Sequence, residues 1–408
     1  MENGMEKQAV LTTNEKIEKA GLLCFYIGLL LELLIVILDK SSWINPFEGQ
    51  MFRVSFLFFA LKITMTRYSF KEWTAILAAG LIAGICYLCS DRDEAVRVVV
   101  FVAAMKGVDY KKAMKLTFWC TVFGMLVLAG LAGAGVLGEV WDAGEGYGIK
   151  EGSRRLCLGV GNSNALAIMV WALMTLGLYV YQEKMKWQYY CLLIVLSGIV
   201  YKLTFTRTTL LMMLFTLVAA AVLQYSPKLR ERAWVYICGV LMLLAGIAFS
   251  VFAAYISTWP PLLPEPVRKL DSVLTGRISS IYPFENGGGV LENWKLFGDP
   301  NYVEYFDMGY VRLFFWYGII PGICCVVLLS LLMWQCKKQK DAMGFVLVLV
   351  FCMFTVIEAH AVSVYIARNY VLFLLGAYWI YMLPGRKKTE RMSFWWQPWK
   401  LFDRGEKV

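Results

Sequence analysis

Six arginines are the residues of this chain whose type and spacing most suggest chemistry. They lie at or near the ends of long apolar runs: Arg154, Arg155, Arg207, Arg277, Arg312 and Arg368. A guanidinium forms bidentate hydrogen bonds with phosphate oxygens and keeps its charge at a membrane interface. An arginine inside a span costs roughly 2.5–3.5 kcal/mol on insertion scales, so several at one boundary require anionic partners. The pattern favours binding of a diphosphate, which suits a cluster of guanidinium groups.

The alternative is that acids of the chain neutralise these arginines. Asp307 is close in sequence to Arg312, and Glu358 is close to Arg368. Long arginine side chains can also extend from a span to the membrane surface. The sequence leaves both explanations open.

Three residues are candidates for the group that accepts a proton in catalysis. His360 is the single histidine, and a neutral imidazole accepts protons near pH 7. Asp307 and Glu304 belong to an acidic cluster in the longest connection between apolar runs. The sequence does not choose among the three.

Other familiar catalytic patterns are missing from the sequence. It contains no GxxxxGK[ST], HExxH or GxSxG motif, which argues against nucleotide-driven pumping, zinc hydrolysis and a Ser-His-Asp triad. Cys86 and Cys89 have CxxC spacing, but they end an apolar run and are expected to pack as small hydrophobes. We expect neither a metal nor another cofactor.

Glu32 is an acid inside the first apolar run. Intramembrane acids are commonly functional, so Glu32 suggests proton-coupled transport, or else it pairs with Lys62 or Arg53.

The composition defines the elements that must position these residues. Of 408 residues, 59% are hydrophobic and 17% are charged, with a mean hydropathy of +0.58. Soluble domains have about 45–50% apolar and about 25% charged residues. We therefore expect an all-α polytopic integral membrane protein with about twelve transmembrane helices. The expected spans are 21–38, 44–61, 72–90, 94–105, 116–138, 157–181, 188–203, 208–225, 234–256, 310–334, 342–358 and 362–383.

The basic residues suggest how these spans are oriented. When alternate connections are assigned to opposite sides, 25 of the 40 Lys and Arg fall on one side together with both termini. Lys and Arg are enriched in cytoplasmic loops, so both termini are expected in the cytoplasm of a multi-pass protein of the cell membrane. The net charge of +10 thus reflects topology, and no nucleic acid partner is expected.

Four regions follow from this topology. Residues 1–256 form an N-terminal transmembrane bundle of about nine helices, and 257–309 form a large extracytoplasmic loop. Residues 310–383 form C-terminal transmembrane helices, and 384–408 form a basic cytoplasmic tail. Loops longer than about 15 residues are usually functional in compact proteins.

Several short motifs occur in an order that resembles the O-antigen ligase and polymerase superfamily. Arg154-Arg155 followed by Gly159-Val-Gly-Asn-Ser-Asn164 resembles its R…GxGNPN element, and Thr206-Arg207-Thr208 resembles its SRT element. The elements of its large outer loop are matched by Leu274-Thr-Gly-Arg277, Leu296-Phe-Gly298, Asp307-Met-Gly-Tyr310 and Trp316-Tyr-Gly-Ile-Ile320. The ligases have a histidine where Asp307 stands, and this difference favours a polymerase of the exopolysaccharide or capsule type.

The resemblance implies a GT-C-like fold and a metal-independent glycosyltransferase. Such an enzyme polymerises undecaprenyl-diphosphate-linked oligosaccharides on the outer face of the membrane. By this resemblance, Arg154 or Arg155, Arg207 and Arg277 would hold the lipid diphosphate, and the arginine pattern itself adds Arg312 to this set. Supporting roles would fall to Asn162, Asn164, Glu358 and Arg368.

The expected partners are the lipid-linked oligosaccharide, membrane lipid and, as further components, a chain-length regulator and a flippase. Two alternative functions remain: a ligase that transfers glycan to another acceptor, and a flippase or transporter of lipid-linked oligosaccharide. A transporter often shows paired halves with broken helices in corresponding positions, and the sequence shows neither.

Overall fold

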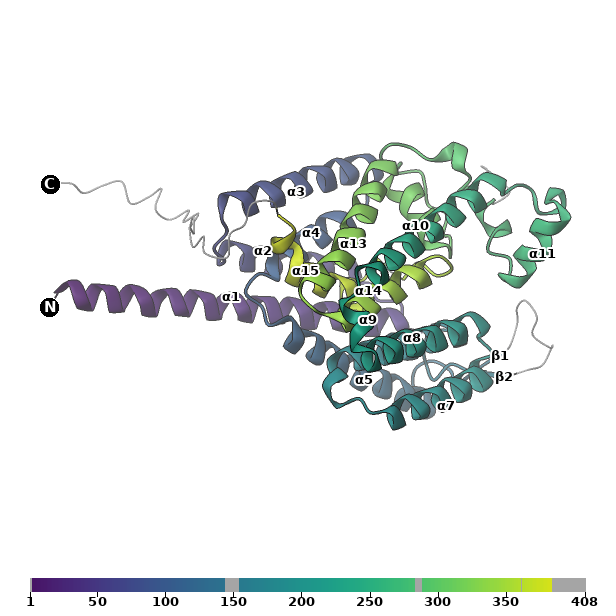
Figure 1. The fold of residues 1–408 in the computed structure, drawn as a ribbon, viewed down its shortest axis with the longest axis horizontal. Coiled ribbons are helices and arrows are strands. Elements are labelled where there is room, and N and C mark those ends of the chain that lie inside the picture. The colour runs from purple at the N-terminus through teal and green to yellow at the C-terminus, as the bar shows by residue number, and fades with distance from the viewer. Residues whose placement is uncertain (1, 144–153, 283–287, 361, 384–408) are drawn as a thin grey trace.

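The computed structural model describes residues 2–143, 154–282, 288–360 and 362–383, and it is mostly helical (Figure 1). The expected basic tail, 384–408, lies outside the described residues, as does 283–287 of the long connection. The helices are α1 (Glu2–Lys40), α2 (Glu48–Thr64), α3 (Phe70–Ser90), α4 (Glu94–Ala104), α5 (Tyr110–Gly133), α6 (Ser163–Val180), α7 (Trp187–Thr204), α8 (Arg207–Tyr225), α9 (Pro227–Glu231), α10 (Ala233–Ile256), α11 (Glu265–Val273), α12 (Gly309–Arg312), α13 (Ile319–Lys338), α14 (Ala342–Thr355) and α15 (Val371–Met382).

Seven helices of the described chain are long and apolar enough to cross a membrane. They are Glu15–Lys40 of α1, α3, α5, α6, α8, α10 and α13. Several expose large apolar side chains, such as Leu81 on α3 and Leu241 on α10. A water-soluble protein rarely exposes such continuous apolar surface, so these helices indicate a membrane protein.

Short polar residues fix where several helices begin. Ser69 and Glu72 form a reciprocal capping box at the start of α3. The side chains of Asp109, Asn162 and Asp341 accept hydrogen bonds from the first turns of α5, α6 and α14. These caps satisfy amide groups that have no partner within the helix.

Helix α14 lies at the centre of the bundle. It packs against α6, α8, α10, α13 and α15, and nearly all of its side chains are buried. An apolar helix of 10 to 14 residues is typical of a buried core helix, and one that is apolar on all sides must be covered on all sides. Its length and composition are therefore explained by its interior position.

Hydrogen bonds between distant segments define two ends of the bundle. At one end, the Gly161 amide donates to the Lys40 carbonyl over 3.1 Å, and Asn164 donates to Glu358 over 3.2 Å. At the other end, Lys106 pairs with Glu72 at 2.6 Å. We call these the arginine end and the lysine end. Helix α11 and two short strands, β1 (Trp141–Ala143) and β2 (Arg154–Leu156), lie far from the N-terminus, at the arginine end (Figure 1).

The structure corrects the sequence analysis in three places. The chain is not wholly α-helical, because β1 (Trp141–Ala143) and β2 (Arg154–Leu156) form an antiparallel pair. The expected span 310–334 is broken at Gly318, where a π-helical turn, Leu313–Tyr317, gives way to α13. Helices α6 and α15 begin at Ser163 and Val371, later than the apolar runs that contain them.

Candidate functional site

Arg277 and Glu358 form an ion pair at the arginine end. The Arg277 guanidinium also donates from Nε to the Ile357 carbonyl over 2.8 Å. Asn164, near the start of α6, donates to the same carboxylate oxygen of Glu358 over 3.2 Å. The network therefore ties the long connection, the segment after α14 and the start of α6 together.

A tight turn after α11 positions Arg277. Asp271 accepts hydrogen bonds from the amides of Ile278 and Ser279 at 2.7 and 3.1 Å. Thr275 and Gly276 in the same turn have φ values of 59° and 80°. The left-handed conformation at Gly276 costs little because glycine has no Cβ. This turn directs the Arg277 side chain towards the segment after α14.

Glu358 is almost enclosed, and its environment shows where Asp307 lies. Burial raises the pKa of Glu358, the positive charge of Arg277 opposes this rise, and the negative charge of Asp307 adds to it. Asp307 is therefore within electrostatic range of Glu358. Unlike Glu358, Asp307 is exposed. An exposed carboxylate within electrostatic range of this ion pair is accessible to solvent and to a ligand.

Arg154 and Arg207 are exposed and open. Within the described residues, neither side chain forms a hydrogen bond or an ion pair. Between them, Arg155 donates from Nε to the Thr204 carbonyl at the end of α7 over 3.1 Å. This bond fixes β2 against the turn that leads into α8, so two open guanidinium groups lie on adjoining elements.

Arg207 lies at the same end of the bundle as the Arg277–Glu358 pair. It is the first residue of α8, and α8 packs against α14. Gln224 near the end of α8 donates to the Gln182 carbonyl after α6, and Tyr179 near the end of α6 donates to Asp341 before α14, so α8 and α14 run in opposite directions. The start of α8 and the end of α14 therefore lie at the same end of the bundle. Helix α8 also packs against α6, which carries Asn164. The open arginines and the buried network thus share one end of three neighbouring helices.

Asn162 has a structural role at the start of α6. Its side-chain oxygen accepts a hydrogen bond from the Ala165 amide over 2.8 Å, which makes it the helix cap. The next residue, Ser163, donates to Asp142 on β1 over 3.2 Å. The supporting residue predicted at 162 therefore shapes the helix, whereas Asn164 faces the ion pair.

Arg312 is the last residue of α12 and packs against the end of the long connection. Its guanidinium stacks over the ring of Tyr305, 3.5 Å from the centroid, and donates from Nε to the Phe306 carbonyl over 2.9 Å. It makes no ion pair with Asp307, although these two residues were possible partners in the sequence analysis. The side chain is buried, and its hydrogen bond to the Phe306 carbonyl holds segment 304–308 in place.

Glu304 is the second acid of this segment. The Trp316 indole donates to its backbone carbonyl over 2.8 Å, and the carboxylate oxygen Oε2 is enclosed without a hydrogen bond within the described chain. Asp307 is the more open of the two acids.

His360 is fully buried among aromatic rings. It meets Trp171 and Phe351 edge to face at centroid distances of 5.1 and 4.9 Å. The Arg368 guanidinium lies 3.2 Å from Nδ1, and since it can only donate, Nδ1 accepts and the proton is on Nε2. Burial and the charge of Arg368 lower the pKa of His360 well below its usual value. In this structure the imidazole is closed to a substrate, and Arg368 pairs with it instead of Glu358.

Glu32 lies apart from these residues, inside the bundle. Its Oε1 accepts a hydrogen bond from Ser55 of α2 over 2.6 Å. Lys62, one of the partners suggested by the sequence, instead bonds with Thr66 at 2.6 Å. The sequence analysis therefore missed the partner of Glu32, because it considered only charged side chains.

This end of the bundle carries two open cations, Arg154 and Arg207, and one open carboxylate, Asp307, around a hydrogen-bonded ion pair. Exposed guanidinium groups of this kind can bind an anionic group such as a phosphate. Searches of protein-family models, curated proteins and solved structures find no match to this chain.

Proposed function

We propose that the chain is a glycosyltransferase of the cell membrane that polymerises undecaprenyl-diphosphate-linked oligosaccharide repeat units into surface polysaccharide. The observation that carries this proposal is the pair of open arginines, Arg154 and Arg207, at the same end of the bundle as the Arg277–Glu358 pair. Anionic partners are needed where cations gather at a membrane boundary, and the carrier diphosphate supplies them. The order of motifs shared with the ligase and polymerase superfamily also supports it.

In this proposal the arginine end faces the outside and both termini are cytoplasmic. The chain crosses the membrane about twelve times, with α4, α14 and α15 as short passes inside the bundle. A lipid carrier keeps its isoprenoid tail in hydrocarbon while its diphosphate is held at the interface. Arginines at the helix ends are at the depth that such a diphosphate requires.

The reaction is a displacement at the anomeric carbon of the donor. A hydroxyl oxygen of the acceptor sugar forms a bond to that carbon, and the bond from the carbon to the diphosphate oxygen breaks. The electron pair leaves with the diphosphate, and the hydroxyl proton passes to Asp307. Arg154 and Arg207 stabilise the charge that builds on the leaving oxygens, which lowers the barrier because this charge is greatest in the transition state and product.

Arg277 is a positioning residue in this mechanism. Its donors are committed to Glu358 and to backbone carbonyls, so it holds the segment after α14 against the long connection. Arg155 similarly holds β2 against α7. Their loss should change the arrangement of the site, whereas loss of Arg207 should remove a contact with substrate.

The test compares Arg207→Ala, Arg207→Lys and Arg268→Ala in cells that lack the native gene. Arg268 is a matched control, an exposed arginine of α11 at the same end whose side chain forms no hydrogen bond or ion pair in the described chain. A lost charge-assisted bond costs about 1.5–3 kcal/mol, so Arg207→Ala should slow polymerisation roughly 10 to 200-fold. Arg207→Lys should recover little because it lacks the bidentate fork. Arg268→Ala should behave as wild type.

The lipid-linked intermediates distinguish the alternatives. A polymerase defect should leave single repeat units on the outer leaflet, whereas a flippase defect should leave them on the inner leaflet. A ligase defect should leave finished polymer on its lipid carrier. Full-length polymer in the Arg207→Ala strain, with normal amounts of protein in the membrane, would remove Arg207 from the site.

A further inference from the structure

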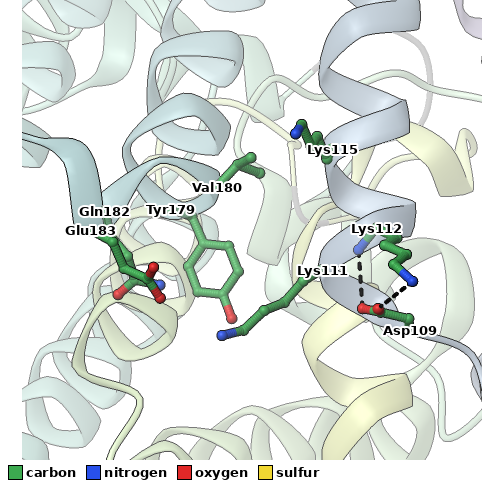
Figure 2. Close-up of a pocket in the computed structure, with 8 residues that line it drawn as sticks. All are labelled: Asp109, Lys111, Lys112, Lys115, Tyr179, Val180, Gln182 and Glu183. Atoms are coloured by element: carbon green, nitrogen blue, oxygen red, sulfur yellow. Dashed lines mark hydrogen bonds and ion pairs between the residues drawn. The ribbon is translucent and has the colours of Figure 1, made fainter.

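A basic pocket lies at the lysine end, away from the candidate site. It has a volume of about 290 Å³ between the start of α5 and the end of α6. Its lining is Asp109, Lys111, Lys112, Lys115, Tyr179, Val180, Gln182 and Glu183 (Figure 2). Nothing in the proposed polymerisation uses these residues, so the pocket requires its own explanation.

Two of the three lysines are uncommitted. Lys112 pairs with Asp109 at 3.5 Å, and Asp109 also caps α5 by accepting a hydrogen bond from the Lys112 amide. Lys111 and Lys115 are exposed and form no hydrogen bond or ion pair in the described parts of the chain. In Figure 2 the amine of Lys111 points towards Tyr179.

The only acid of the lining besides Asp109 is Glu183, which is exposed and makes no ion pair within the described residues. The Tyr179 hydroxyl donates to Asp341 over 2.9 Å, so the Asp341 carboxylate already has a hydrogen-bond partner. Two free ammonium groups and one free carboxylate therefore belong to the lining of this pocket. The pocket is suited to an anion, because Glu183 does not neutralise the two lysines.

The surface of α5 next to the pocket has the polarity profile of one membrane leaflet. Lys115, Trp119, Phe123 and Leu126 follow one another at intervals of three or four residues, so they share a face of the helix. Trp119 is 54% exposed and Phe123 is 70% exposed. The Trp119 indole donates to the Tyr181 hydroxyl over 2.8 Å. Charged, then aromatic, then apolar side chains are typical of the path from headgroup to acyl chain.

We propose that this pocket binds the phosphate of an anionic phospholipid, whose acyl chains lie along the exposed face of α5. Basic pockets between membrane helices bind such headgroups by charge. The apolar stripe below the lysines is the reason to assign a lipid rather than free phosphate, since a free ion would use the lysines alone. This inference needs a membrane around the helices, and it is independent of the polymerase proposal.

The experiment uses the full chain in nanodiscs that contain equal parts of phosphatidylglycerol and phosphatidylcholine, followed by native mass spectrometry of the lipid that stays bound. Wild type should retain phosphatidylglycerol preferentially. Each lysine near a charged lipid contributes about fivefold in affinity, so Lys111→Gln with Lys115→Gln should weaken retention roughly 30-fold. Glu183→Gln should strengthen it, which tests the pocket without removing a lysine.

The control removes two other exposed lysines of the lysine end, Lys71 and Lys228, by the same change to glutamine. This double variant should retain phosphatidylglycerol as wild type does. Equal losses in the two double variants, or no preference for phosphatidylglycerol in wild type, would overturn the proposal. Release of the lipid by millimolar inorganic phosphate would assign the pocket to the free ion instead.

Discussion

Arg277 donates to a carboxylate, a threonine hydroxyl and backbone carbonyls, whereas Arg207 makes no such bond within the described chain. Both were expected to bind a diphosphate. The difference arises from burial, because an enclosed guanidinium must have its donors satisfied by protein, while an exposed one is satisfied by water until a ligand arrives. The residue types are visible in the sequence, but their burial depends on contacts between distant segments. The sequence placed Glu358 with Arg368, which is near it in the chain, and the fold pairs it with Arg277.

The Arg277–Glu358 pair should be strongly coupled. Removal of one partner leaves a nearly buried charge, so Arg277→Gln and Glu358→Gln should each lower the free energy of unfolding by about 3–5 kcal/mol. The double variant should lose clearly less than the sum of the two. Unfolding in detergent measures this double-mutant cycle.

The control for this cycle is the exposed pair of Lys269 and Glu265, joined at 2.8 Å on α11. Exposed pairs within a helix contribute about 0.3–0.5 kcal/mol, so this coupling should be small. Similar coupling energies in both cycles would contradict the buried character of the Arg277 network.

His360 should make stability depend on pH. Because burial lowers its pKa in the folded state, the folded chain stays neutral while the unfolded chain binds a proton near pH 6.5. Above pH 6.5 the His360 side chain is neutral in both states and does not lower the free energy of unfolding. As the pH falls from 6.5 towards the folded-state pKa, the free energy of unfolding decreases by up to about 1.4 kcal/mol per pH unit. His360→Gln keeps an acceptor for Arg368 and should flatten this dependence. Thermal unfolding between pH 5 and pH 8 checks it, and identical slopes for both proteins would refute it.

At the scale of elements, the apolar runs predicted where helices lie, and tertiary packing decided where they begin and break. The run 157–181 includes Gly159 and Gly161, yet α6 starts only at Ser163. The preceding turn brings Gly159 against Leu128 of α5, where a Cβ would lie 2.8 Å from the carbonyl oxygen. Likewise, a Cβ on Gly318 would meet Phe297 at 2.4 Å, so the break before α13 is set by the long connection. Neither contact is visible in a hydropathy pattern.

Gly159 and Gly161 should therefore respond differently to alanine. Gly159 has a φ of 75° and no room for a Cβ, whereas Gly161 has open space around it. Gly159→Ala should cost about 1–3 kcal/mol in backbone strain, in addition to the clash with α5. It should also reduce polymer formation, because this turn leads from Arg155 to Asn164. Gly161→Ala should be nearly neutral in thermal unfolding, and equal melting temperatures for the two variants would contradict this account of the turn.

At the scale of the whole molecule, the distribution of charge agrees with the two ends seen in the structure. Lys62, Lys106 and Lys112, assigned to one side by the sequence, lie at the lysine end, and Arg155 and Arg277 lie at the other. The sequence could assign these residues to two sides because successive spans end on alternate sides of the membrane. Only the order of the apolar runs is needed for that assignment. It could not show which arginines meet, since that depends on how α6, α8 and α14 pack together.

The orientation of these two ends in the membrane can be tested directly. Lys184 lies between α6 and α7 at the lysine end, and Val273 is an exposed residue at the end of α11. In a background without the native cysteines, Val273→Cys should react with an impermeant maleimide on intact cells, because the arginine end is proposed to face out. Lys184→Cys should react only after the cells are permeabilised, because lysines concentrate on the cytoplasmic side. The reverse pattern would invert the topology and place the open arginines in the cytoplasm, where polymerisation on the outer leaflet is impossible. Labelling of both positions in intact cells would instead contradict a membrane between the two ends.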